Sequence, residues 1–249
     1  MNYRHVFHAG NICDVVKHAV LSLALGYLRN KDKGFFVLDT HSGTGLYDLA
    51  DERARKTGEA AQGILKLLAS PRLAGLADYY RVLDELNPAG TGNLRFYPGS
   101  PAIARHLMRP QDRLVACELH EEDAAALRRY FRHDKQAQMH HRDGYEALNA
   151  FLPPPEKRGL ALIDPPFEDP QEFARLAQAL VGAHGRWPQG IYMAWYPVKE
   201  RPAVWRFHEA LGTSGIPGKL CAEFVYREEI RHDRLIGCGL FIVNAPWKL

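Results

Sequence analysis

From residue 113 onward, short apolar segments alternate with amphipathic segments of helical spacing. The apolar ones, such as "RLVACEL", "GLALID" and "GIYMAWYP", are nearly continuous runs, as expected of strands that are buried on both faces. This alternation predicts an α/β fold built on a doubly wound, mostly parallel sheet. The last two strands expected, at 219–230 and 236–246, have no long helical segment between them, so we expect an antiparallel strand pair at one edge.

The N-terminal part of the chain adds a helix, a strand and a polar helical region. Residues 11–34 show apolar side chains at helical spacing, with Asn11 as a candidate cap, and the strand "FFVLD" follows. Residues 51–95 contain two expected helices, at 54–70 and 76–90, and no strand pattern. We therefore expect a single domain over residues 1–249, with 51–95 inserted as a small helical subdomain.

Charge and cysteine content exclude several classes of protein. The 249 residues carry a formal net charge of +3, which permits a polyanionic partner without requiring one. The four cysteines are far apart and form no CxxC pair, so we expect reduced thiols and no metal site. The N-terminus has no apolar leader segment, and no apolar run approaches the roughly 18 residues of a membrane span. A cytoplasmic protein with no membrane partner is expected.

Three polar motifs follow three of the predicted strands, where ligands bind in doubly wound sheets. In "FFVLDTHSGTG", Gly43 and Gly45 allow a tight turn and a close approach to a ligand. In "LVACELH", Glu118 is placed to bind a ribose diol, or else it caps a helix or lies on the surface. In "MHHRDGYEAL", Asp143 either caps the next helix through its carboxylate or accepts from an adenine amino group.

The fourth motif, "LALIDPPFEDP", is the most specific. Pro165 and Pro166 fix the backbone and donate no hydrogen bond, so the carbonyl between them faces outward beside Asp164. These two acceptors match the two N–H groups of an aromatic amine, and Phe167 offers a face on which its ring can stack. Base–aromatic stacking contributes about 1–3 kcal/mol, comparable to the cost of unstacking a base. Asp164, Pro165 and Phe167 are thus the predicted catalytic group.

Taken in order, "DTHSGTG", "CELH", "RDG" and "DPPF" resemble the motifs of S-adenosylmethionine-dependent amino-methyltransferases, whose fourth motif is [DNS]PP[YFW]. The segments "YRHVFHAGNICDVVKH", "YPGSP", "GIYMAWYP" and "NAPWKL" extend the likeness over essentially the whole chain. They are similar to the bacterial 23S ribosomal RNA (adenine-N6) methyltransferase J family. Members usually carry Tyr at the position of Phe167, which also presents an aromatic face. The resemblance implies a class I methyltransferase, Rossmann-like fold, acting as a monomer on 23S ribosomal RNA.

The resemblance also implies roles for individual residues. The cofactor would be contacted by Lys17, His18, His41, Gly43 and Ser100. Its ribose would be bound by Glu118, and its adenine by Asp143 and Gly144. Asp164 would face both the cofactor and the target amine. Tyr3 would meet the substrate RNA together with Phe167. Before the resemblance, Lys17 and His18 are equally compatible with a solvated helix face.

Two other functions remain open on the sequence. A DNA adenine or cytosine-N4 methyltransferase would share all four motifs, although no large target-recognition region is present. A non-catalytic nucleic-acid-binding protein serving the use of external DNA would have no reason to keep a cofactor site. Two basic groups could bind RNA phosphates: the segment 128–142, and the side chains Arg53, Arg55, Lys56 and Lys66 of the insertion. In the segment 128–142, however, the neighbouring apolar residues Leu127, Tyr130 and Phe131 also fit a helix whose one face packs inward.

Overall fold

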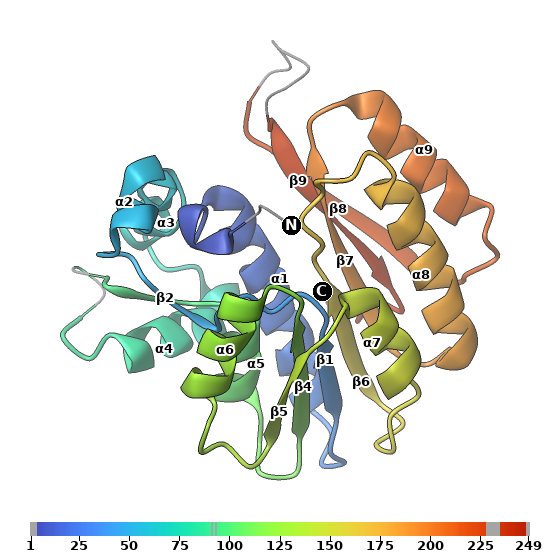
Figure 1. The fold of residues 1–249 in the computed structure, drawn as a ribbon, viewed down its shortest axis with the longest axis horizontal. Helices are drawn as coiled ribbons and strands as arrows, with labels where there is room; N and C mark the ends of the chain where they lie inside the picture. The colour runs from blue at the N-terminus through green and yellow to red at the C-terminus, as the bar shows by residue number, and fades with distance from the viewer. Residues whose placement is uncertain (1–3, 91, 93, 228–234, 248–249) are drawn as a thin grey trace.

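A seven-stranded sheet forms the centre of the protein in the computed structural model, which describes residues 4–90, 92, 94–227 and 235–247 (Figure 1). Its strands, in spatial order, are β5 (Ala137–His141), β4 (Arg113–Glu118), β1 (Phe36–Asp39), β6 (Gly159–Ile163), β7 (Ile191–Val198), β9 (Gly237–Val243) and β8 (Lys219–Val225).

The sheet reverses its direction of growth at β1. From β1 the chain passes to β4 and then β5 on one side, and it returns to place β6 on the other side of β1. The pairs of β1 with β4 and with β6 are parallel, whereas β9 is antiparallel to both β7 and β8. The predicted doubly wound, mostly parallel sheet with an antiparallel edge is confirmed, and the gap between β1 and β6 is its topological switch point.

Helices cover both faces of the sheet because its strands alternate their side chains between two apolar cores. Val37 of β1 and Leu160 of β6 point into one core, while Leu38 and Ile163 point into the other. The first core is covered mainly by α1 (Ile12–Arg29), α5 (Ser100–Leu107) and α6 (Glu121–Tyr130), and the second by α7 (Gly144–Phe151), α8 (Glu172–Arg186) and α9 (Arg201–Gly212).

Two features of the insertion differ from the sequence prediction. The expected helix at 54–70 is wrong: it divides into α2 (Glu52–Thr57), the 3₁₀ turn η2 (Glu59–Gln62) and α3 (Ile64–Leu68), because Gly58 ends α2 in a left-handed conformation. The segment is also bracketed by an unforeseen antiparallel pair, β2 (Leu46–Asp48) with β3 (Phe96–Pro98). Strands of three residues are too short to show a periodic pattern.

The second expected helix of the insertion is present as α4 (Ala77–Leu86), preceded by the 3₁₀ turn η3 (Ala74–Leu76). Its Tyr79, Val82 and Leu83 are buried in the first core, so this part of the insertion packs on the body of the protein. Whether 51–95 forms a separate subdomain stays a prediction.

At the N-terminus, the 3₁₀ turn η1 (His5–Phe7) leads into α1, which begins as the sequence predicts. The side chain of Asn11 accepts a hydrogen bond from the backbone N–H of Asp14. Within the residues that the structure describes, no helix is long and apolar enough to cross a membrane.

Gly159, the first residue of β6, is the glycine that the strand pairing most strictly requires. Its φ is +151°, and a Cβ atom there would lie 1.9 Å from the carbonyl oxygen of Phe36 on the neighbouring strand. We expect Gly159→Ala to lower the free energy of unfolding by roughly 2–4 kcal/mol, as measured by urea denaturation.

Gly182 of α8 provides the matched control, because a Cβ there would meet nothing within 4 Å. Gly182→Ala should stabilise the helix by about 0.5–1 kcal/mol. Equal effects of the two substitutions would contradict the strand constraint.

Candidate active site

A cavity of about 700 Å³ opens at the carboxyl ends of β1, β4 and β6, beside the switch point. All the predicted site residues that the structure describes line it: Lys17, His18, His41, Gly43, Ser100, Glu118, Asp143, Gly144, Asp164, Pro165 and Phe167. Tyr3 lies outside the described residues. Motifs up to 150 residues apart in the chain thus share one chamber.

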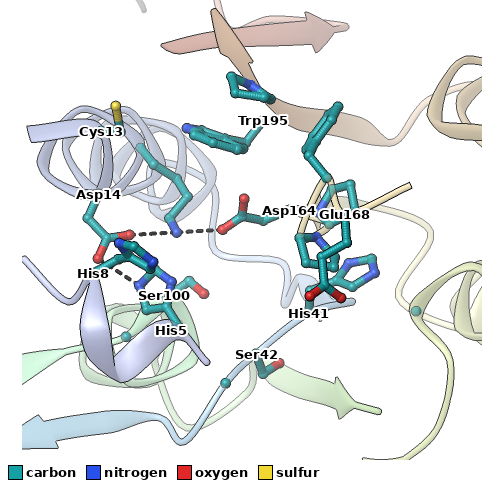
Figure 2. A pocket seen from close by; sticks show the side chains of 18 of the residues that line it. His5, His8, Cys13, Asp14, His41, Ser42, Ser100, Asp164, Glu168 and Trp195 are labelled. Carbon is teal, nitrogen blue, oxygen red and sulfur yellow. Dashed lines mark hydrogen bonds and ion pairs between the residues drawn. The ribbon is translucent and has the colours of Figure 1, made fainter. Parts of the chain in front are cut away.

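Lys17 bridges two carboxylates in this cavity. Its Nζ lies 2.8 Å from Oδ1 of Asp14 and 2.5 Å from Oδ2 of Asp164, so it joins α1 to the end of β6. Figure 2 shows the carboxylates of Asp14 and Asp164 facing one another across this ammonium group. The Lys17 side chain is only 5% exposed. The alternative of a solvated helix face is therefore wrong for this residue.

Charge pairing overrides desolvation in this network. Burial alone would lower the pKa of Lys17, but Asp14 and Asp164 raise it well above its ordinary value. Burial likewise favours protonation of Asp14, yet His5 and Lys17 hold its pKa well below 3.8. Lys17 and Asp14 are therefore both ionised at neutral pH.

Asp14 and His5 are members of this network that the sequence motifs do not identify. His5 Nε2 lies 2.8 Å from Asp14 Oδ2, which also accepts from the backbone N–H of Gly10 at 3.1 Å. The i,i+3 spacing of Asp14 and Lys17 on a helix was a usable signal. His5 precedes the helix, and only the folded chain brings it to Asp14.

Two histidines in the cavity are held neutral by burial. The pKa of His18 falls to about 3 and that of His41 to about 4, in both cases mainly through desolvation. His18 Nδ1 is 2.8 Å from the hydroxyl of Tyr97, while its Nε2 is buried with no partner among the described residues. His18 is thus no solvated helix residue, and its free nitrogen is an unused polar site.

The glycine-rich turn after β1 is fastened to the end of β4. Gly43 N donates to Oε2 of Glu118 at 2.8 Å, and His120 N donates to Oε1 at 2.7 Å. Burial raises the pKa of Glu118. A carboxylate has about four acceptor positions, so Glu118 keeps lone pairs for hydroxyl groups of a ligand.

Asp143 performs the capping role that the sequence left open. Its Oδ1 accepts from the backbone N–H groups of Tyr145 and Glu146, and its Oδ2 lies 2.9 Å from Arg175. Gly144 is needed for close packing, because a Cβ atom there would lie 2.6 Å from the ring of His41. The same two residues line the cavity, so capping does not preclude ligand contact.

The "DPPF" corner lines the cavity, and two of its acceptor oxygens make no hydrogen bond within the described part of the chain. The Oδ2 atom of Asp164 accepts a hydrogen bond from Lys17, whereas its Oδ1 atom has no hydrogen-bond partner among the described residues. No hydrogen bond from those residues reaches the carbonyl oxygen of Pro165. Phe167 has a backbone φ of +52°, which is strained for a residue with a bulky side chain. The centroid of its ring lies 4.8 Å from that of Phe173 and 5.9 Å from that of Trp195, both in edge-on contacts.

Asp39, on which "FFVLD" ends, is a buried acid that the motifs passed over, and it lies next to the cavity without lining it. Both of its carboxylate oxygens are buried without a hydrogen-bond partner among the described residues. Burial raises its pKa to about 6, against the opposing effects of the neighbouring Ser100 and Ser42 side chains, neither of which completes a hydrogen bond to its carboxylate, and of Lys17. An unpartnered buried acid at the end of β1 is a place where a ligand donor could bind.

The Asp14–Lys17 pair generates a prediction for stability and its pH dependence. Asp14→Asn should lower the free energy of unfolding at pH 7 by about 3 kcal/mol, because it removes one partner of a buried pair. Since the folded-state pKa of Asp14 lies well below 3.8, the unfolded chain takes up this proton first on acidification. The stability difference between wild type and variant should therefore be complete well above pH 3.8 and shrink as the pH falls through that value.

Asp84→Asn is the matched control, since Asp84 forms an exposed pair with Arg72 at 2.7 Å. Its cost should not exceed about 1 kcal/mol. Urea titrations at several pH values measure both differences, and a pH-independent effect of Asp14→Asn would contradict the assignment.

Comparison with known proteins agrees with the geometry of this site. The profile described as RsmJ, ribosomal RNA large subunit methyltransferase D, RlmJ, matches residues 32–249. The chain is 41% identical to ribosomal RNA large subunit methyltransferase J of Escherichia coli and 40% identical to that of Haemophilus influenzae. Each of these matches covers the whole of this chain and 89% of the relative.

Solved structures share the fold. A crystal structure of protein LPL1258 from Legionella pneumophila has a TM-score of 0.88 at 36% identity, over 97% of this chain and 88% of that one. The METTL16 methyltransferase domain shares the fold, with a TM-score of 0.51 at 11% identity, over 92% of this chain and 67% of that one. The chain belongs to the RsmJ family, the ribosomal RNA large subunit methyltransferases J.

Proposed function

We propose that the protein transfers a methyl group from S-adenosylmethionine to the N6 amine of an adenine in 23S ribosomal RNA. The family assignment supports methyl transfer to ribosomal RNA. One observation carries the choice of an amine: the open Oδ1 of Asp164 and the open carbonyl of Pro165 stand beside the ring of Phe167 at the cavity. An exocyclic amine on a flat ring has two N–H groups for these acceptors.

The cavity has the polar groups that this cofactor requires. Glu118 would accept from its ribose hydroxyls, and Asp143 with Gly144 would border its adenine. Lys17, His18, His41 and Ser100 would surround its methionine end, with Gly43 leaving room for it in the turn. The unpartnered oxygens of Asp39 suit an ammonium group at that end. When bound, the cofactor supplies an electrophilic methyl group on a positively charged sulfur.

The residues of this chain would act mainly by orientation. Lys17 holds Asp164 in place, and Asp164 with the Pro165 carbonyl would take the two amine hydrogens, which directs the nitrogen lone pair toward the methyl carbon. Phe167 would hold the ring in that plane. An adenine amine is a weak base, and its proton can leave during or after transfer, so positioning accounts for more of the rate than general-base strength.

The substrate RNA needs a basic surface near the cavity mouth. Glu59 of the insertion lines the cavity, and the exposed side chains of Arg55 and Lys56 lie in the preceding helix α2. Beside and within the segment 128–142, Leu127 and Phe131 are buried, which confirms that the end of this helix packs inward, while Arg128 and Arg129 are exposed. Both basic groups lie close in sequence to cavity residues, Lys56 to Glu59 and Arg142 to Asp143, so both stay candidates for binding phosphates.

The two alternative functions make different predictions for simple assays. Calorimetric titration with S-adenosylmethionine should detect binding, whereas a pure nucleic-acid-binding protein would give none. Methyl transfer should then be compared on bare 23S RNA, ribosomal particles and duplex DNA, with the product nucleoside identified by mass spectrometry. N6-methyladenosine in the RNA is expected, and methylated DNA alone would favour the DNA methyltransferase.

Asp164→Ala should abolish methyl transfer, because it removes an acceptor of the target amine. Lys17 keeps Asp14 as a partner at 2.8 Å, so the fold should persist and cofactor binding should stay measurable by calorimetry. Glu146→Ala, at an exposed position of α7 outside the cavity lining, serves as the control and should retain activity. Wild-type turnover by Asp164→Ala would rule out the assigned role.

Phe167→Ala should chiefly weaken the complex with the target base. Loss of about 1–3 kcal/mol of stacking corresponds to a roughly 5- to 150-fold fall in kcat/KM for RNA. Phe167→Tyr keeps the aromatic face and should stay near the wild-type value. Steady-state kinetics on the RNA substrate test this pair, and unchanged KM and rate in the alanine variant would argue against stacking.

A further inference from the structure

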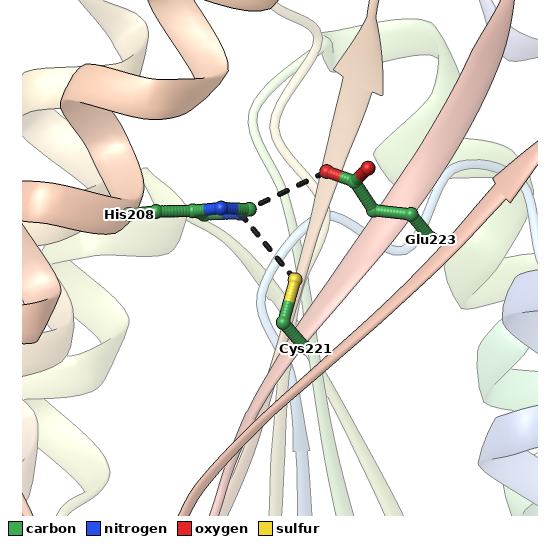
Figure 3. A group of neighbouring side chains, drawn as sticks. All are labelled: His208, Cys221 and Glu223. Atoms are coloured by element: carbon green, nitrogen blue, oxygen red, sulfur yellow. Dashed lines mark hydrogen bonds and ion pairs between the residues drawn. The ribbon is translucent and has the colours of Figure 1, made fainter.

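A second cluster of reactive side chains lies at the antiparallel edge of the sheet, apart from the cavity. His208 comes from α9, while Cys221 and Glu223 are two residues apart on β8 and therefore point to the same face (Figure 3). His208 Nε2 lies 3.4 Å from Cys221 Sγ and 3.9 Å from Glu223 Oε1, and these three atoms all fall within 4.8 Å of one another.

A fourth donor completes this group from the strand on the other side of β9. The hydroxyl of Tyr196 on β7 lies 2.9 Å from His208 Nε2, 2.9 Å from Cys221 Sγ and 3.1 Å from Glu223 Oε1. Gly239 of β9 makes this approach possible, because a Cβ atom there would lie 2.3 Å from that hydroxyl oxygen.

The four donor atoms lie close enough together to surround one small ion as an irregular tetrahedron, with the sixth separation, from Cys221 Sγ to the Glu223 carboxylate, within 4.8 Å. The five separations given above range from 2.9 to 3.9 Å. The centre of a tetrahedron of this size lies roughly 2 Å from each corner, which is close to the length of Zn²⁺ bonds to nitrogen, oxygen and sulfur. Imidazole, thiolate and carboxylate are also the ligand types that Zn²⁺ selects.

We propose that His208, Cys221, Glu223 and the hydroxyl of Tyr196 form a tetrahedral site for Zn²⁺. On binding, the metal replaces the proton of the Cys221 thiol, a sulfur–metal bond forms, and the proton passes to solvent. The site is independent of the proposed methyl transfer. It would join α9, β7 and β8, and so fasten the outer edge of the sheet.

The surroundings of the cluster suit a metal ion. His208 Nε2 is the ring nitrogen that faces the other three donor atoms. Arg201 binds the other oxygen of Glu223 at 2.7 Å and thereby fixes the orientation of the carboxylate. Cys221 is exposed, whereas the other three cysteines are buried, so an ion can reach this thiol from solvent.

The test uses the full chain after removal of metals with a chelator. Equilibrium dialysis against Zn²⁺ should give one ion bound per chain, and Co²⁺ should produce a thiolate charge-transfer band with the intense visible bands of tetrahedral coordination. Cys221→Ser should abolish the charge-transfer band, and both it and His208→Ala should weaken Zn²⁺ binding at least tenfold. Absence of stoichiometric binding by the wild type would overturn the proposal.

His106→Ala is the control for adventitious binding, since His106 is another surface histidine, paired with Glu85 at 3.0 Å. It should bind Zn²⁺ as the wild type does. If Cys221→Ser and His208→Ala bound Zn²⁺ as tightly as the wild type, the proposed site would be overturned. If a variant fails to fold, alkylation of the wild type still decides: Zn²⁺ should protect the Cys221 peptide from a thiol reagent, and unchanged labelling would refute the proposal.

Discussion

The ion pair between Lys17 and Asp164 is the contact on which the arrangement of the cavity depends. It joins the first long helix to the end of β6 at 2.5 Å, across 147 residues of chain. Because Lys17 is buried, its charge requires a facing carboxylate, and Asp14 and Asp164 each supply one. Stability and chemistry are therefore linked: the carboxylate that would orient the target amine also compensates a buried charge.

The sheet and the strand-end motifs could be predicted because each is local in sequence. Apolar runs mark the buried strands, and the positions of Glu118, Asp143 and Asp164 follow from the ends of those runs. Contacts that depend on folding could not be predicted in this way. His5 reaches Asp14 through a turn, and Phe167 adopts a left-handed conformation that its residue type disfavours.

The same limit explains the errors outside the cavity. Strands β2 and β3 have three residues each and pair across the whole insertion, so neither carries a pattern of its own. The expectation of no metal stays untested, and it rests on the lack of close spacing such as CxxC, by which metal motifs are recognised in a sequence. The donors of the proposed Zn²⁺ site are spread over residues 196–223 and meet only where α9, β7 and β8 come together.

The order of the last strands has a consequence for how the chain assembles during its synthesis. Strand β9 is made after β8, yet it lies between β8 and β7 and pairs with both. While the ribosome is still extending the chain, β8 therefore has no place in the sheet, and β7 remains an open edge. Open edges invite pairing between chains. The outer third of the sheet must consequently form in one late step, after the switch point and its cavity have all their strands.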